Sequence, residues 1–175
     1  MSGAVASQVR RTVLLGSCAL SLLAAACGNA PSTTASDDAN VALLRRVVDE
    51  GWTAKKYEVL PELYAADFVS YTNGVRDSIP GPAGVEADMK EIATQNPDYT
   101  VTIDEVFSAG DRVVMLWTFK GTDVPTGKPI QVAGTTVSRI ANGKVTESRA
   151  NFDLLGATLA TGATITPPAA AAPSK

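Results

Sequence analysis

The feature that most constrains the fold is the segment from Val132 to Gly156. Two runs rich in β-branched residues flank the dipeptide Asn142-Gly143 within it. Asn-Gly in this setting is the strongest short-range signal for a β-hairpin, because both central residues of the favoured turn adopt a positive φ angle. The sequence therefore predicts that the ordered part of the chain closes with two antiparallel strands.

The same period-two pattern extends toward the N-terminus. Tyr99, Val101 and Ile103 alternate with polar residues, and a second alternating run follows the turn at Gly110-Asp111. Apolar residues at every second position place one face of a strand against a core. A further strand is predicted at residues 68–72, and the tail, residues 161–175, is rich in Ala and Pro and is expected to be disordered.

Three helices are predicted before the strand that begins near Tyr99. The first follows Asp37 and Asp38, whose negative charge favours a helix N-terminus. Its apolar face is made by residues at helical spacing, Val41, Leu44, Val48 and Trp52. A short second helix is predicted at residues 57–66, and the third lies between the Pro80-Gly81-Pro82 loop and Pro97. Helices first and strands afterwards indicate an α+β domain rather than alternating βαβ units.

The first 26 residues are interpreted as a lipoprotein signal peptide. Arg10 and Arg11 precede an apolar run that is shorter than the ~20 residues of a membrane span. Leu23 to Gly28 resembles a bacterial lipobox, which makes Cys27 the expected lipidation site, with Cys18 as the alternative. Export through the Sec or the twin-arginine route stays open. We expect an extracytoplasmic protein of the bacterial cell envelope, anchored to the membrane by lipid at Cys27, with residues 27–37 as a flexible tether.

The amino-acid composition excludes several kinds of catalytic and metal site. The 175 residues suffice for one domain, the net charge is −3, and there is no histidine. A histidine-free chain excludes Ser-His-Asp and Cys-His nucleophiles and the usual zinc sites, so neither a metal nor a cofactor is expected. The mildly acidic balance argues against nucleic acid as a partner. Lipidation of Cys27 leaves no disulfide framework in the mature domain.

Several short segments, in this order and spacing, resemble the SnoaL-like polyketide cyclase family of the nuclear transport factor 2-like superfamily. They are Asn40–Trp52, Leu63–Val69, Gly84–Val85, Ala109–Val114, Thr126–Lys128, Arg139–Val145 and Phe152–Gly156. The resemblance assigns residues 38–160 to one SnoaL-like domain. It implies a cone-shaped α+β fold in which three N-terminal helices cover a strongly bent antiparallel sheet and leave a conical pocket.

The resemblance also locates the family's catalytic positions. In the aldol cyclases of the family, an aspartate on the last strand acts as general acid and base, helped by a histidine, a glutamine and an asparagine. These four positions fall on residues that cannot replace them, Ala150, Thr136, Gly134 and Ser70 respectively. Alanine cannot move a proton, so the ring-closing mechanism of the family is not expected here.

Other side chains are candidates for the pocket. Aromatic residues and hydroxyls suit a site for a mostly apolar ligand. The predicted pocket residues are Trp52, Tyr57, Tyr64, Ser70, Tyr71, Trp117, Thr136, Ser148 and Ala150. Alternation along the last strand places Thr146, Ser148, Ala150 and Phe152 on the pocket side. Asp153, at the end of that strand, is the candidate catalytic carboxylate, with a capping role as the alternative, and Asp88 and Glu91 are interpreted as a solvated helix face.

Three functions follow from these observations. The leading hypothesis is a lipid-anchored domain that binds a small apolar, polyketide-like molecule without cyclase chemistry. The second is an ester cyclase or isomerase that uses a carboxylate such as Asp153. The third is a protein-interaction module whose exposed sheet face forms a homodimer or docks on a complex of the cell envelope.

Overall fold

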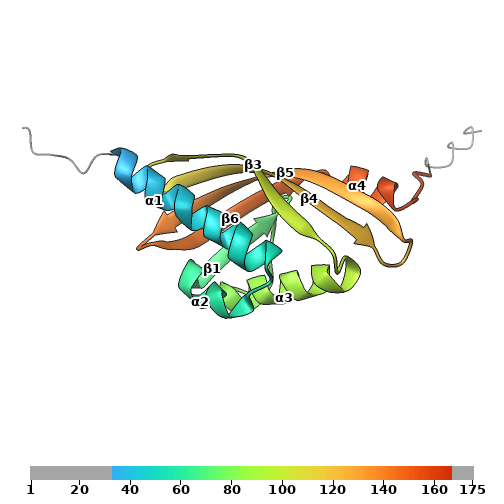
Figure 1. The fold of residues 1–175 in the computed structure, drawn as a ribbon, viewed down its shortest axis with the longest axis horizontal. Helices are drawn as coiled ribbons and strands as arrows, with labels where there is room; N and C mark the ends of the chain where they lie inside the picture. Colours follow the sequence, from blue (N-terminus) through green and yellow to red (C-terminus); the bar gives the residue numbers. More distant parts are fainter. Residues whose placement is uncertain (1–32, 167–175) are drawn as a thin grey trace, which may run out of the picture. The chain divides into compact units, whose positions relative to one another are not determined.

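A computed structural model describes residues 33–166. The predicted signal peptide, Cys27, most of the predicted tether and the end of the tail lie outside these residues. Four α-helices and six strands follow one another along the chain (Figure 1). The helices are α1 (Thr33–Arg46), α2 (Leu60–Leu63), α3 (Gly81–Gln95) and α4 (Leu154–Ala160). The strands are β1 (Tyr64–Thr72), β2 (Val75–Arg76), β3 (Thr100–Ala109), β4 (Arg112–Asp123), β5 (Lys128–Ala141) and β6 (Lys144–Phe152).

The six strands form one sheet in the order β2-β1-β6-β5-β4-β3. The predicted α+β class is confirmed, but the sheet is mixed rather than antiparallel, because β1 runs parallel to β6. Strands joined by a hairpin are antiparallel, whereas β1 and β6 lie far apart in the sequence and are connected through α3 and four other strands. The direction of this pair is therefore a property of the tertiary structure.

The closing hairpin has the predicted turn. Asn142 and Gly143 have φ angles of 53° and 71°, and Ala141 pairs with Lys144 across the turn. A register shift follows: Ile140 pairs with Val145, whereas Arg139 pairs with Glu147. This bulge interrupts the alternation of side chains. The prediction that Thr146 faces inward is wrong, because Val145 occupies the core and is 1% exposed.

The first helix starts earlier than predicted. α1 begins at Thr33, within the predicted tether, so Asp37 and Asp38 lie inside the helix rather than at its N-terminus. The Asp37 carboxylate accepts hydrogen bonds from Ser108 Oγ and from Gly110 N, at 3.1 and 3.2 Å. Asp37 therefore ties α1 to the β3–β4 turn. After α1 the chain continues as a π-helical turn, Val47–Thr53.

The second helix is shorter than predicted. A single 3₁₀ turn, Tyr57–Val59, leads into α2, which ends at Leu63. β1 begins at the next residue because Tyr64 pairs with Val145 of β6. The third helix, α3, begins at Gly81 and ends at Gln95, just before Pro97, in agreement with the prediction.

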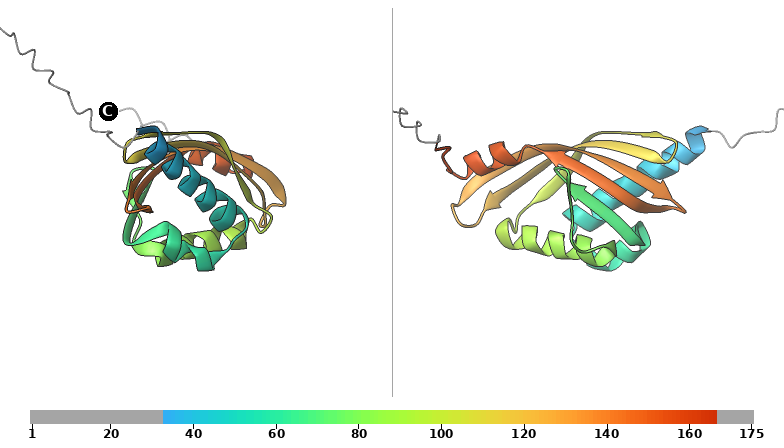
Figure 2. Two further views of the ribbon diagram at one scale, coloured as in Figure 1. Left: turned by 60° about the vertical axis from the view of Figure 1, so that its left-hand side comes forward. Right: turned by 180° about the vertical axis from the view of Figure 1, so that it is seen from behind.

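The core lies between these helices and one face of the sheet, which we call the concave face (Figure 2). Side chains from α1, the π-helical turn, α2, α3 and the strands meet there. The buried cluster comprises Leu44, Val47, Leu60, Leu63, Tyr64, Phe68, Val85, Met89, Val113, Ile140 and Val145. We call the opposite surface of the sheet the outer face. Within residues 33–166, no helix is long and apolar enough to cross a membrane.

Candidate functional site

Five of the predicted pocket residues gather on the concave face. Strand pairing sets Thr136 directly opposite Ala150, and Ser148 between Ser138 and Ser70. Ser138 is only 1% exposed and pairs with the fully buried Val113, which identifies this face as the one toward the core. The residues concerned are Ser70, Trp117, Thr136, Ser148 and Ala150. The positions of the family's histidine and aspartate are thus cross-strand neighbours, as a shared catalytic role would require.

The Trp117 indole fills the space above Gly134. A Cβ atom added to Gly134 would lie 2.3 Å from Trp117 Cζ2, so only glycine fits beneath the ring. Trp117 Nε1 donates a hydrogen bond of 2.9 Å to Thr136 Oγ1. The Phe152 ring lies beside the indole, with centroids 6.0 Å apart and planes at 56°. We call the rings of Trp117 and Phe152 the aromatic platform; it occupies the region where the resemblance places glutamine and histidine.

The platform lies in a part of the concave face that retains solvent exposure. Trp117, Phe152, Thr136 and Ala150 are each partly exposed. In contrast, Val113, toward the hairpin turn at residues 142–143, is buried by the helices. The concave face is therefore closed toward that turn and more open around the platform, where a bound molecule would contact aromatic and hydroxyl groups.

Hydroxyl groups line one side of this region. Ser138 Oγ and Ser148 Oγ share a hydrogen bond of 2.9 Å, and Ser70 Oγ donates to the Asp77 carboxylate. Thr136 Oγ1 already accepts from the Trp117 indole, which leaves its own proton for an acceptor. These groups can hold the oxygen atom of a ligand, although none of them is an acid that could exchange protons readily.

Two carboxylates lie near the Ser70 side of this face. Asp88, on α3, is exposed, as the sequence predicts, yet desolvation, and then the negative charges of Asp77 and Glu91, raise its pKa above the usual range. Asp77 was not a candidate, because its hydrogen bond to Ser70 depends on how the segment before α3 folds back onto β1. No pattern in the sequence links these residues.

The remaining predicted pocket aromatics occupy other places. Tyr64 is buried in the core, with its ring 4.7 Å from that of Phe68, and burial raises the pKa of its hydroxyl to about 12, against the effect of a hydrogen bond with Trp52. Trp52 and Tyr57 are partly buried and pack against the core cluster. They therefore belong to the helical layer that covers the concave face.

Tyr71 does not line the concave face. It pairs with Arg149, and the Arg149 guanidinium lies 4.0 Å from the centre of its ring. Its neighbour Ser70 points to the concave face, so alternation along β1 turns Tyr71 to the outer face. The assignment of Tyr71 to the pocket is corrected for this reason.

Asp153 caps a helix. Its Oδ1 atom accepts a hydrogen bond of 2.7 Å from the backbone N of Gly156, in the first turn of α4. The residue is exposed. This geometry matches the capping alternative.

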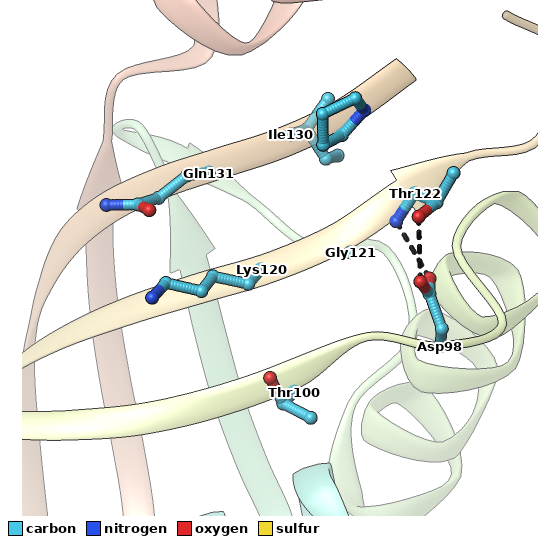
Figure 3. Close-up of a pocket in the computed structure, with 8 residues that line it drawn as sticks. Asp98, Thr100, Lys120, Gly121, Thr122, Ile130 and Gln131 are labelled. Atoms are coloured by element: carbon cyan, nitrogen blue, oxygen red, sulfur yellow. Dashed lines mark hydrogen bonds between the residues drawn. The ribbon is translucent and has the colours of Figure 1, made fainter. Parts of the chain in front are cut away.

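Two open grooves lie along the sheet. The first, of about 480 Å³, is shown in Figure 3. There Asp98 accepts hydrogen bonds from the Thr122 backbone N and Oγ1, both at 2.7 Å, and these bonds lower the pKa of the Asp98 carboxyl. Its lining consists of Asp98, Thr100, Lys120, Gly121, Thr122, Pro129, Ile130 and Gln131.

The second groove, of about 470 Å³, reaches Asp153, the N-cap residue of α4. Its lining consists of Asp104, Leu116, Trp117, Ala133, Gly134, Thr135, Asn151, Phe152 and Asp153. Trp117, Gly134 and Phe152 belong to the concave face, whereas Leu116, Thr135 and Asn151 alternate with them. The second groove therefore includes both rings of the aromatic platform, but it is an open groove rather than the enclosed conical pocket that the sequence predicts. In the part of the chain that the structure describes, no three His, Cys, Asp or Glu side chains gather as a metal site would require.

The mixed sheet with helices against its concave face defines a ketosteroid isomerase-like, or nuclear transport factor 2-like, α+β protein. The family model for SnoaL-like polyketide cyclases matches residues 42–160. The chain therefore belongs to the SnoaL-like polyketide cyclase family.

Solved structures agree with this assignment. A protein from Jannaschia sp. CCS1, named "Putative SnoaL-like polyketide cyclase", is 26% identical, with a TM-score of 0.67 over 74% of this chain and 95% of that one. A protein with a ketosteroid isomerase-like fold from Catenulispora acidiphila DSM 44928 is 20% identical, with a TM-score of 0.63 over 71% of this chain and 97% of that one. No curated protein matches the chain.

Proposed function

We propose that this domain binds a small, mostly apolar molecule with a carbonyl group, such as a polyketide-like ketone, without the ring-closing chemistry of the family. The observation that carries the proposal is that other residues replace the family's catalytic groups on the concave face. The Trp117 indole covers Gly134 and bonds to Thr136. Ala150 lies opposite Thr136 and occupies the position where the family has its acid. The site has gained apolar surface and lost its proton-transfer groups.

The chemistry of the remaining groups supports binding. The aromatic platform offers a flat apolar surface, and the Thr136 hydroxyl offers a donor beside it. A positioned acid-base group contributes about 10² to 10⁴ in rate, and neither Ala150 nor Thr136 is such a group. The whole sequence has no histidine to take this role from elsewhere.

The enzyme hypothesis based on Asp153 has less support than binding. Asp153 lines the same groove as Trp117 and Phe152, but its Oδ1 atom is occupied by the N-cap bond to the first turn of α4. The homodimer stays a prediction of the sequence.

For the whole chain we extend the proposal to the membrane: lipid at Cys27 would hold the domain on the outer side of the membrane, where it would meet its ligand.

The proposal is tested with 1-tetralone, a bicyclic ketone. The chain has two tryptophans, so the Trp52→Phe variant leaves Trp117 as the sole fluorescent reporter. We expect saturable quenching of Trp117 by 1-tetralone, a rise in the unfolding temperature, and no cyclisation of a linear diketone above the uncatalysed rate. Trp117→Leu should weaken binding about tenfold, because it removes much of the platform.

Two results would contradict this function. Absence of any saturable binding in the wild-type protein would refute the ligand site. Turnover of the diketone, if this activity stays with the protein through further purification, would show that the chain is an enzyme. The same assay on Asp153→Asn would then decide whether Asp153 is responsible.

A further inference from the structure

The Thr136 hydroxyl has a proton without an acceptor in the chain. Its oxygen accepts the hydrogen bond of 2.9 Å from Trp117 Nε1, and within residues 33–166 this side chain forms no other hydrogen bond. The cross-strand neighbours of Thr136 are Met115 and Ala150, and neither carries a side-chain oxygen or nitrogen atom. An acceptor for this proton therefore has to come from outside the chain.

The Trp117 indole fixes the role of this hydroxyl. A hydroxyl oxygen that accepts from an N–H group still has its own proton to donate, and the bond it receives strengthens the bond that its proton makes. The indole is held in place over Gly134, where a Cβ atom would lie 2.3 Å from Cζ2, and beside the Phe152 ring. Thr136 thus presents a hydrogen-bond donor at the edge of the aromatic platform, and Trp117 is the residue that positions it.

The small side chain of Ala150 leaves room directly opposite this donor. Thr136 and Ala150 are both partly exposed. The backbone at Ala150 is held by Asn73, whose backbone N donates to Ala150 O at 2.8 Å and whose Oδ1 accepts from Phe152 N at 3.0 Å. Asn73 has a φ angle of 48°, in the left-handed region that non-glycine residues rarely adopt. A ligand oxygen can therefore approach the hydroxyl from the Ala150 side, over a strand whose position is fixed.

We propose that the Thr136 hydroxyl, positioned by the Trp117 indole, donates a hydrogen bond to a ligand oxygen that lies over Ala150, and that the site thereby selects carbonyl compounds over N–H compounds of the same shape. This inference rests on the proposed function and names the group that sets its ligand specificity. A ligand that offers only N–H brings a second donor to an oxygen that already accepts one, and it leaves the hydroxyl proton unpaired. A carbonyl oxygen pairs with that proton.

The test uses three bicyclic probes that differ in one group. 1-Tetralone has a carbonyl acceptor, 1,2,3,4-tetrahydroquinoline has an N–H donor, and tetralin has neither. Calorimetric titration of the wild-type protein at neutral pH gives the affinities. We expect 1-tetralone to bind about three- to tenfold more tightly than tetralin, which is the effect of one neutral hydrogen bond, and tetrahydroquinoline to bind no more tightly than tetralin.

Variants of one strand assign this preference. Thr136→Val removes the hydroxyl and keeps a β-branched side chain, so it should bind 1-tetralone only as tightly as tetralin. Thr136→Ser keeps the hydroxyl and should retain the preference. Thr135→Val is the matched control, because it makes the same change at the neighbouring residue of β5, which alternation turns to the outer face. It should bind all three probes as the wild type does, and thermal unfolding shows that each variant is folded.

The role of the indole is measured on its own N–H signal. In the Trp52→Phe variant Trp117 is the sole indole, so its signal is identified without ambiguity in a proton–nitrogen NMR spectrum. A hydroxyl that donates is a better acceptor, so 1-tetralone should move the indole proton further downfield than tetralin does. Adding Thr136→Val should move the signal upfield and abolish the difference between the two probes.

Four outcomes would overturn the inference, and they can be told apart. Equal binding of 1-tetralone and tetralin by the wild type would refute the donor and leave the ligand site intact. Loss of the preference in Thr135→Val rather than Thr136→Val would place the ligand oxygen on the outer face. Equal responses of the indole signal to both probes would remove the positioning role of Trp117. Failure of the wild-type protein to bind any probe would refute the proposed function, and this inference with it.

Discussion

Gly134 and Trp117 are the pair of residues that sets this concave face apart from the catalytic pattern of its family. A glycine in a strand interior weakens the strand unless a neighbour needs the space. Here the neighbour is the indole of Trp117, which is fixed over Gly134 by its hydrogen bond to Thr136. A change at any one of these three positions alters the surface offered to a ligand.

We expect Gly134→Ala to destabilise the domain by about 1 to 3 kcal/mol, because the new methyl group would displace the indole. The free energy of unfolding in urea measures this loss. In a Trp117→Leu background the same substitution should cost much less, since the clashing ring is gone. Equal losses in both backgrounds, or a stable Gly134→Ala protein, would show that the indole does not depend on Gly134.

At the scale of secondary structure, α4 is a short helix that its own packing holds only weakly. Its seven residues include no buried side chain, and Leu154, Leu155 and Leu159 are exposed. Isolated helices of this length are unstable in water. The N-cap bond from Asp153 to Gly156 is therefore a main determinant of its order, together with its packing against β5.

We expect Asp153→Ala to loosen α4 and to leave the rest of the domain folded. Loss of an N-cap costs about 1 kcal/mol, which corresponds to roughly fivefold faster exchange of the Gly156 amide hydrogen. Asp153→Asn keeps a capping side chain, so its exchange rate and its binding of 1-tetralone should match those of the wild type. Hydrogen exchange followed by NMR measures both variants. An unchanged Gly156 amide in Asp153→Ala would contradict the capping role.

At the scale of the whole molecule, the predicted lipid at Cys27 would decide where the domain works. The net charge of −3 gives no basis for attraction to anionic lipid headgroups. Membrane association would thus depend on the acyl chains, and stable anchoring requires more than one chain.

We expect Cys27→Ser to release the protein from the membrane fraction of a bacterial expression host, whereas Cys18→Ser should leave it there. Membrane and soluble fractions are compared by immunoblot, and mass spectrometry of the wild-type N-terminus identifies the modified residue. The reverse pattern would assign the lipid to Cys18.

The local elements of this fold could be predicted because their signals lie within short windows. The Asn142-Gly143 turn needs only two residues with positive φ, and alternation along residues 99–103 and 113–119 needs only a period of two. The end of α3 just before Pro97 has the same origin, since proline cannot continue the helix. The absence of histidine likewise excluded histidine-based catalysis without any structure.

The tertiary structure alone decided which residues meet. The parallel pairing of β1 with β6, the bulge that brings Val145 into the core, and the tie from Asp37 to the β3–β4 turn all depend on segments distant in sequence. The same is true of the site. Thr136 and Ala150 were named from the sequence, but the indole over Gly134 and the outward turn of Tyr71 result from packing between elements. A short window encodes local conformation and the spacing of apolar residues, whereas register, and therefore the contents of a site, is fixed only when distant strands and helices come together.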